Sequence, residues 1–216
     1  MRASVEVRFT DRADGDLSAL SVEPGLDDRR RAIVDRPWTW LHQVHGSRVV
    51  VVDRPGQHAG TEADAAVTAC PGAVVAVQTA DCAPLALVAP RAVGVVHVGW
   101  RGLADGVVDA AVAALRALDD GPIAARLGPC IRPRCYEFGP GDLGLVAESC
   151  GDAVRATTAW GTPALDVPAG IVARLAALGV TGVDDAGTCT ACSPAHWSFR
   201  ADADRARQAV VAWLPP

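Results

Sequence analysis

Apolar runs of strand length, separated by short polar interruptions, dominate the middle of the chain. The runs at 73–79, 84–90 and 92–100 are nearly continuous in valine, alanine and leucine, which predicts strands buried on both faces. Turn signals stand before and between them, at the Cys-Pro-Gly of 70–72 and at Pro90-Arg91. Further strand patterns lie at 4–10, 39–53, 63–69 and 123–129, and a loop at His45-Gly46 interrupts the second of these.

Helical periodicity appears mainly in the second half of the chain. The clearest case is 101–121, which is rich in alanine, carries apolar residues at spacings of three and four, and stops at Gly121-Pro122. Strands and helices interleave without regular alternation, and no repeat or linker interrupts them. We therefore expect a single α/β domain over 1–216, layered and with a mixed sheet. Further helices are predicted at 24–36, 141–151, 168–180 and 202–214.

Composition narrows the class of protein. Half of the 216 residues are apolar, as in a globular domain, and the net charge of -5 argues against a nucleic-acid surface. All 20 basic residues are arginine, so an arginine alone is weak evidence of function. We see no targeting segment and no apolar run of roughly 18 residues, and therefore expect no membrane association. The seven cysteines do not resemble a disulfide framework, which favours the reducing cytoplasm.

Three residues at predicted strand ends are candidate metal ligands. His45 precedes a glycine at a strand–loop junction. Cys82 follows the buried strand predicted at 73–79, and His97 stands near the end of the one predicted at 92–100. Two imidazoles and one thiolate suit zinc and leave a fourth position for water or substrate, as in catalytic sites. Spacing alone does not establish that the three side chains meet.

Two charged neighbours are candidate catalytic residues beside Cys82 and His97. Asp81 directly precedes the cysteine, where it either bonds to its own turn or orients a ligand and moves a proton. Arg101 stands at a predicted helix start, where it is either a solvated charge or an anion clamp aided by backbone amides. We favour the functional interpretation for Asp81 and leave both open for Arg101.

Several ordered stretches resemble the signature motifs of the laccase-domain family, also called the multicopper polyphenol oxidase family. That family includes bacterial purine nucleoside phosphorylases of an unusual type and the peptidoglycan editing factor. The resemblance runs from about Trp40 through Phe138 and resumes in two later stretches. The matching segments are HQVHG, TADCAP, HVGWRG, LGPCIRPRCYEFG, LDVPAGIVARL and TCTACSPAHWSFRADADRAR.

The resemblance implies a three-layer α/β/α fold, a monomer, and zinc held by His45, Cys82 and His97. It also implies phosphorolysis of purine nucleosides, namely adenosine, inosine and by extension methylthioadenosine, with adenosine deamination as a side activity. Purine nucleoside and phosphate are then the partners. The chain departs from the family at Val98, where a smaller residue is usual, at the stretch HWSFRAD, and at Arg132 and Arg134, which replace small residues. The last two put substrate preference in doubt.

Other functions remain open at this stage. A copper polyphenol oxidase needs many imidazoles, and the chain has five histidines and a single methionine, although one copper ion in the zinc site fits the same donors. A metal-free Cys82–His97 pair suits a hydrolase or amidase that edits peptidoglycan precursors. A non-catalytic binding module is a further alternative. Cys189 and Cys192 form a CxxC, but no second CxxC accompanies it, so we interpret Cys192 as incidental.

Overall fold

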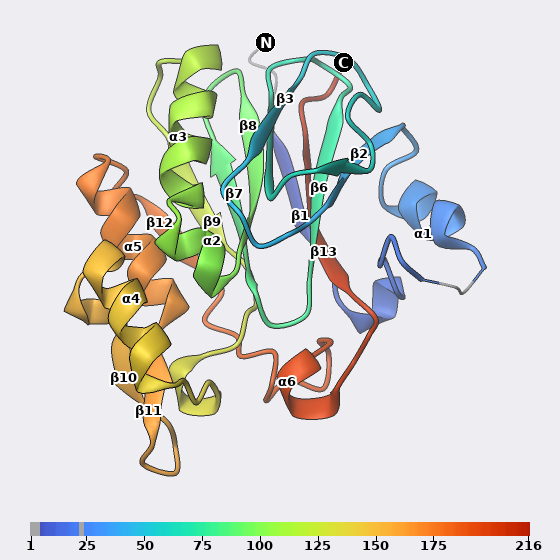
Figure 1. Cartoon of the computed structure of the whole chain (residues 1–216). Coiled ribbons are helices and arrows are strands. Elements are labelled where there is room, and N and C mark those ends of the chain that lie inside the picture. Colours follow the sequence, from blue (N-terminus) through green and yellow to red (C-terminus); the bar gives the residue numbers. More distant parts are fainter. Residues whose placement is uncertain (1–4, 22–23) are drawn as a thin grey trace.

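Two mixed β-sheets packed face to face form the centre of the molecule (Figure 1). The computed structural model describes residues 5–21 and 24–216. The five-stranded sheet has the order β1 (Glu6–Phe9), β13 (Gln208–Trp213), β6 (Val74–Thr79), β2 (Trp38–His42) and β4 (Thr61–Glu62). The six-stranded sheet has the order β12 (Val183–Asp185), β9 (Ala124–Leu127), β7 (Ala83–Val88), β8 (Val93–Val98), β5 (Ala65–Thr68) and β3 (Val49–Val52).

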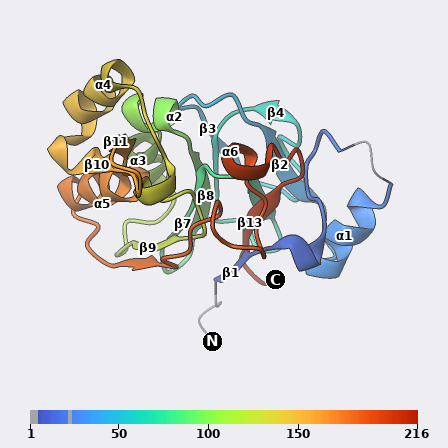
Figure 2. The same ribbon diagram turned by 90° about the horizontal axis from the view of Figure 1, so that it is seen from below.

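Helices flank the two packed sheets on both sides (Figures 1 and 2). Those on the six-stranded sheet are α2 (Trp100–Ala104), α3 (Val107–Leu118), α4 (Pro140–Cys150) and α5 (Val167–Ala177). On the far side, α1 (Leu26–Ile33) packs on the five-stranded sheet. A hairpin of β10 (Arg155–Thr157) and β11 (Pro163–Leu165), and the short α6 (Phe199–Asp202), complete the fold.

Strand β6 shows how the sequence produces this layering. Successive side chains of a strand point to opposite faces. Val75 and Val77 accordingly pack between the two sheets, whereas Val74 and Ala76 pack on the outer face with Leu17 and part of α1. Both sets are fully buried, which is why the sequence of this strand is a continuous apolar run and not an alternating one.

The predicted α/β class, the mixed sheets and the single domain are confirmed. The strands, however, divide between two sheets, a division that apolar runs alone do not reveal. The predicted helix at 101–121 breaks into α2 and α3 at Gly106, whose φ of 82° is left-handed and ends the first helix. The predicted strand at 4–10 is observed as β1, and its first residue lies outside the described residues.

The prediction of a C-terminal helix over 202–214 is wrong. Only Asp202, the last residue of α6, is helical within that range, and Gln208–Trp213 forms strand β13. The strand pairs antiparallel with β1 on one side and β6 on the other. Val210 and Val211 are fully buried on opposite faces of the sheet. A central position between two strands therefore outweighed the weak helical periodicity.

Two further features concern the helices and the cysteines. Within 5–21 and 24–216, none of the helices combines the length and apolar character that crossing a membrane requires. All seven cysteines carry free thiols, as we expected from their number and spacing.

Candidate metal centre

The register of the six-stranded sheet brings Cys82 and His97 to the same edge. Strands β7 and β8 are antiparallel, with Ala83 opposite Val98 and Pro84 opposite His97. Cys82 precedes β7, so it lies at the level where β8 ends. On the other side of β8, strand β5 is also antiparallel, and its start at Ala65 lies opposite Val96. The residue before β5, Asp64, therefore also reaches this edge.

Asp64 organises the third segment of the site, the loop between β2 and β3. Its fully buried carboxylate accepts hydrogen bonds from the backbone N–H groups of Val44 at 3.2 Å, His45 at 2.9 Å and Gly46 at 2.8 Å. His45 adopts φ 62°, a left-handed conformation that costs a non-glycine residue about 1–2 kcal/mol. The bonds to Asp64 hold the loop in that conformation and so aim the imidazole.

The three predicted ligands converge. The ligand atoms of His45, Cys82 and His97 all lie within 4.8 Å of one another. Nε2 of His45 is 3.7 Å from Sγ of Cys82, and the two imidazole rings stand edge to face with centroids 4.8 Å apart. His97 is buried, Cys82 is half-buried and His45 is exposed, so the group opens to solvent on one side.

Asp64 also fixes the ring of His97. Nδ1 of His97 lies 2.8 Å from Oδ1 of Asp64, which leaves Nε2 for the centre of the site. A carboxylate that holds the distal nitrogen of a ligand histidine is the usual support of a zinc-bound imidazole. Burial opposes ionisation of Asp64, but the hydrogen bonds from His97 and Gly46 outweigh it and lower the pKa of that carboxyl.

The charges of Cys82 and His97 depend on each other. Burial by itself raises the pKa of the Cys82 thiol, yet the charge of His97 and the hydrogen bond from His45 lower it to about 6. Burial likewise lowers the pKa of His97, but Cys82 and Asp64 raise it to about 9. Near neutral pH the pair is therefore a thiolate and an imidazolium, and a metal ion would take the place of the imidazolium proton.

Two glycines leave room for this arrangement. A Cβ atom on Gly99 would lie 2.6 Å from Cδ2 of His45 and 3.5 Å from Sγ of Cys82. A Cβ atom on Gly102 would lie 2.8 Å from the carbonyl oxygen of Gly46. The start of α2 thus packs directly on the His45 loop, and only glycine permits the close approach.

The carboxylate of Asp81 binds the C-terminal segment of the chain. Its carboxylate accepts hydrogen bonds from the hydroxyls of Thr190 at 2.7 Å and Ser198 at 2.8 Å, and from the backbone N–H of Arg200 at 2.6 Å. Its φ of 92° is left-handed. The contacts indicate a positioning role for the Cys82 turn, and the predicted proton transfer stays a prediction.

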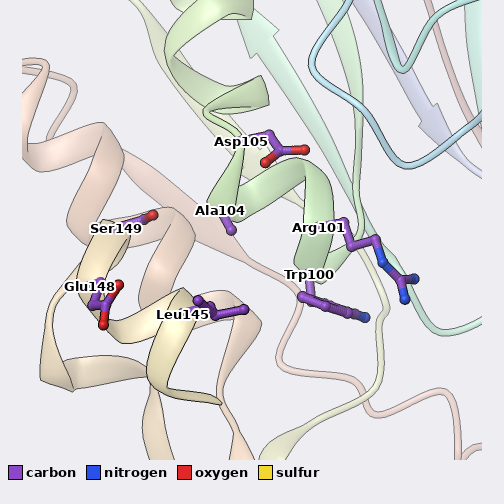
Figure 3. Close-up of a pocket in the computed structure, with 7 residues that line it drawn as sticks. All are labelled: Trp100, Arg101, Ala104, Asp105, Leu145, Glu148 and Ser149. Carbon is purple, nitrogen blue, oxygen red and sulfur yellow. The ribbon is translucent and has the colours of Figure 1, made fainter. Parts of the chain in front are cut away.

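Arg101 borders a pocket between α2 and α4 and does not enter the ligand group. The pocket, of about 380 Å³, is lined by Trp100, Arg101, Ala104, Asp105, Leu145, Glu148 and Ser149. Figure 3 shows the Arg101 side chain extending to the side of α2 away from Glu148 and Ser149. Its guanidinium stacks over Trp100, 4.4 Å from the ring centroid. The helix behind it has five residues, so its dipole adds little.

Tyr136, to which sequence reasoning assigned no role, lies within electrostatic reach of Cys82. Burial raises the pKa of its hydroxyl to about 12, and the next effects come from Cys82, Arg200, Asp81 and Arg101. The ring packs edge to face on Phe138 and lies under the guanidinium of Arg200 at 5.0 Å. Tyr136 therefore stays protonated beside the thiolate, with two guanidiniums within electrostatic reach.

Arg132 and Arg134 differ in their surroundings. The guanidinium of Arg132 pairs with both carboxylate oxygens of Asp185, at 2.8 and 2.5 Å, and this contact raises the pKa of the guanidinium. Arg132 is therefore engaged within the fold. The only hydrogen bond found at Arg134 in the described chain is accepted by its backbone oxygen, from the N–H of Ala159.

The chain is similar in sequence to a known protein family and to several named relatives. The family model described as multi-copper polyphenol oxidoreductase laccase matches residues 26–215. A relative from Streptomyces griseus, named purine nucleoside phosphorylase, is 45% identical over 181 residues, covering 81% of this chain and 73% of its own length. A relative of the same name from Streptomyces coelicolor is 43% identical over 207 residues, covering 94% of this chain and 81% of its own length.

Solved structures share the fold. A Neisseria meningitidis protein of the uncharacterised family DUF152 superposes with a TM-score of 0.86 at 28% identity, covering 100% of this chain and 97% of that one. The YlmD protein of Geobacillus stearothermophilus gives 0.85 at 22% identity, covering 100% and 93%. The match of the family model over nearly all of the chain, with two relatives above 40% identity, shows that this protein belongs to the multi-copper polyphenol oxidoreductase laccase family.

Proposed function

We propose that this protein is a zinc-dependent purine nucleoside phosphorylase that acts on adenosine and inosine, and by extension on methylthioadenosine. The observation that carries the proposal is the convergence of His45, Cys82 and His97 on one point open to solvent. The relatives from Streptomyces and from Mycobacterium tuberculosis, named purine nucleoside phosphorylases at 39–45% identity, supply the reaction class.

The donor set fits zinc. Neighbouring nitrogen and sulfur ligands of a tetrahedral zinc ion lie about 3.6 Å apart, given bonds of roughly 2.0–2.3 Å. Nε2 of His45 and Sγ of Cys82 are 3.7 Å apart. Three protein ligands leave a fourth position, as catalytic sites do. Single copper suits the same donors, so zinc is the proposal and copper its competitor. When bound, such an ion supplies Lewis-acid stabilisation of negative charge.

The chain's own residues account for the other needs of phosphorolysis. In this reaction a phosphate oxygen bonds to C1′ of the ribose while the bond from C1′ to the purine nitrogen breaks. Arg101 and Arg200 both act on Tyr136 electrostatically, and the guanidinium of Arg200 lies 5.0 Å from the centroid of its ring. We assign them to the phosphate, whose planar oxygen pairs suit guanidinium groups. Tyr136, held protonated, offers a hydrogen-bond donor.

Chromatography of a nucleoside reaction tests this proposal. Zinc-loaded protein incubated with adenosine or inosine should release the free base and ribose 1-phosphate only when phosphate is present. Arg101→Gln and Arg200→Gln should raise the KM for phosphate more than they lower kcat. Intact nucleoside after long incubation of the zinc-loaded protein with phosphate would count against the proposal.

Adenosine deamination is the proposed side activity. Zinc deaminases of nucleobases also combine histidine and cysteine ligands, as one histidine and two cysteines, whereas the group here has two histidines and one cysteine. The same assay without phosphate distinguishes the reactions, because deamination turns adenosine into inosine and ammonia without breaking the glycosidic bond.

A metal-free hydrolase or amidase for peptidoglycan precursors is the second candidate. The specific observation in its favour is the paired charge of Cys82 and His97, which resembles the thiolate–imidazolium pair of cysteine hydrolases. A covalent adduct trapped on Cys82 from an amino-acylated precursor, formed in the presence of a chelator, would favour it over the zinc enzyme.

A multicopper oxidase is not supported by the contacts. Among the described residues, the only two groups with metal-ligand spacing are the one built on His45 and one made of three thiols. Neither supplies the many imidazoles of a copper cluster. The expectation of a cytoplasmic monomer stays a prediction, and size-exclusion chromatography with light scattering checks the monomer.

A further inference from the structure

A second cluster of sulfur atoms lies outside the site described above. The thiols of Cys135, Cys189 and Cys192 all lie within 4.8 Å of one another. The Sγ atoms of Cys135 and Cys192 are 3.1 Å apart, well beyond a disulfide bond of about 2.05 Å, and all three thiols are free. The third thiol beside the CxxC motif therefore comes from Cys135, 54 positions before Cys189. The spacing of the cysteines in the sequence does not predict this contact.

Backbone contacts hold the two halves of this cluster together. Cys130 and Cys189 form an isolated parallel bridge, in which the N–H of Thr190 donates to the carbonyl of Cys130 at 3.1 Å. Cys135 closes a short 3-10 helix, Pro133–Cys135. On the other side, the N–H of Cys192 donates to the carbonyl of Cys189 at 3.2 Å. The bridge and the two turns therefore set the position of all three thiols.

One sulfur already accepts a backbone hydrogen bond. The N–H of Arg132 donates to Sγ of Cys189 at 3.4 Å. The side chain of the same arginine bonds separately to Asp185 and to the carbonyl of Thr188. An N–H aimed at a sulfur stabilises a thiolate and is a typical outer contact of sulfur-bound metals.

We propose that Cys135, Cys189 and Cys192 form a second metal site, which binds one thiophilic d10 cation, Zn²⁺ or Cu⁺, through three sulfur atoms. Thiolates around a tetrahedral zinc ion lie about 3.8 Å apart, a value between the 3.1 Å of the Cys135–Cys192 pair and the 4.8 Å within which all three sulfur atoms lie. Soft thiolate ligands select these two ions over harder cations. As each sulfur binds, its proton passes to solvent, and no electron is transferred.

Access from solvent completes the geometric case for a bound cation. The exposure of Cys192 gives the ion a path from solvent.

Metal stoichiometry tests the proposal in a chain whose first site is disabled. A His45→Ala protein, reduced and desalted, is titrated with Zn²⁺ and, anaerobically, with Cu⁺ against competing chelators. The variant should retain about one ion per chain. Whichever of Zn²⁺ and Cu⁺ binds with the higher affinity is the cation of this site. Adding Cys135→Ser or Cys192→Ser should lower the affinity at least about 100-fold. Cys70→Ser is the matched control, since Cys70 belongs to neither group, and it should change nothing.

A second measurement uses the unaltered sequence and does not depend on how the variants fold. Bound Zn²⁺ should protect Cys135, Cys189 and Cys192 from alkylation together, while Cys70 stays reactive, as mapped by peptide mass spectrometry. Equal alkylation of the three with and without metal would overturn the proposal. So would a Cys135–Cys192 disulfide in the protein as purified that persists when Zn²⁺ is present. Either result leaves the His45 site and the phosphorylase proposal unaffected.

Discussion

The two sulfur clusters of this protein differ in what surrounds each thiol. Cys82 lies between two imidazoles: burial raises the pKa of its thiol, but the charge of His97 and the hydrogen bond from His45 lower it to about 6. Cys135 lies against two other thiols, and burial together with those thiols raises its pKa to about 12. The first cluster is fixed by a buried carboxylate, Asp64, that bonds to both a ligand ring and the loop of another ligand. The second is held mainly by backbone hydrogen bonds.

This difference suits the first cluster to catalysis and the second to binding an ion. In the first cluster the neighbouring imidazoles lower the pKa of the Cys82 thiol before any metal binds, and one side stays open. In the second, burial and two neighbouring thiols raise the pKa of Cys135, and a bound cation would take the place of its proton. The two are joined by one turn, because the hydroxyl of Thr190, between Cys189 and Cys192, donates to Asp81, the neighbour of Cys82. The predictions below test how independent they are.

Replacing Cys82 should have the largest effect. Cys82→Ser exchanges a soft anionic donor for a poor neutral one, so zinc affinity at the first site should fall more than about 100-fold and nucleoside turnover should fall with it. Elemental analysis after dialysis should show one ion lost per chain, and excess zinc should restore part of the activity. His45→Ala and His97→Ala should behave alike.

The same variant separates metal chemistry from thiol chemistry. Cys70→Ser serves as the control, because it removes a free thiol outside both clusters. A Cys82→Ser protein that keeps its full metal content and yet loses all activity would identify Cys82 as a nucleophile, and the metal-free hydrolase would then be the better account.

Asp64→Asn should weaken the first site while leaving the second intact. The amide keeps the shape of the side chain but has one acceptor oxygen for contacts that now use two. Metal affinity at the first site should fall about 10–100-fold, and stability should fall by about 1–3 kcal/mol because a buried donor loses its partner. Glu62→Gln, at an exposed position two residues away, is the control.

Chelator competition and thermal melting separate the two parts of that result. If Asp64→Asn lowered the melting temperature but left metal affinity unchanged, Asp64 would serve only to hold the His45 loop. The second cluster, measured in a His45→Ala background, should bind its ion with equal affinity whether or not Asp64 is replaced.

The strands of the core could be predicted because burial on both faces leaves a direct trace in the sequence. Each of β6, β7 and β8 occupies one of the apolar runs. Position within a sheet leaves no such trace. The sequence around Gln208–Trp213 has a weak helical periodicity. The segment forms a strand because it pairs with β1 on one side and β6 on the other. The division into two sheets is likewise a matter of long-range pairing.

The three candidate ligands of the first site could be predicted because histidine and cysteine are scarce in the chain and each of the three stands at a predicted strand end. Asp64 was missed because an aspartate at a strand start is common in any sequence. The antiparallel register of β5 against β8, which places it opposite His97, cannot be derived from spacing. The same holds for Cys135, which meets the CxxC only through the bridge of Cys130 and Cys189.

Gly99→Ala should have a moderate effect confined to the first site. The added methyl group would lie 2.6 Å from the His45 ring, so the ring must shift and zinc affinity should fall about 10-fold, with a stability cost of about 1–3 kcal/mol. Gly144→Ala is the control. No atom lies within 4 Å of its Cβ position in α4, and alanine should stabilise that helix by up to about 1 kcal/mol. Unchanged zinc affinity in Gly99→Ala would show that the His45 ring can move to make room for a methyl group.

Arg132→Gln should have the smallest effect, and it tests whether the second site depends on a side chain or on the backbone. The variant loses the ion pair with Asp185 but keeps the N–H that donates to Cys189. Zn²⁺ affinity of the three-thiol cluster should therefore change less than about 3-fold. Because the pair is partly exposed, stability at pH 7 should fall by no more than about 1 kcal/mol.

The pH dependence of that small loss follows from Asp185. The hydrogen bond from Arg132 lowers the pKa of the Asp185 carboxyl in the folded protein. A lowered pKa contributes stability that is present above the unfolded value of about 4 and is lost as the pH falls through the folded value. Urea unfolding of wild type and Arg132→Gln should therefore differ most near pH 7 and converge below about pH 4. A gap that stays constant down to acidic pH would show that the side chain of Arg132 acts by packing, whereas a large loss of Zn²⁺ affinity would show that the backbone donor is held by the ion pair.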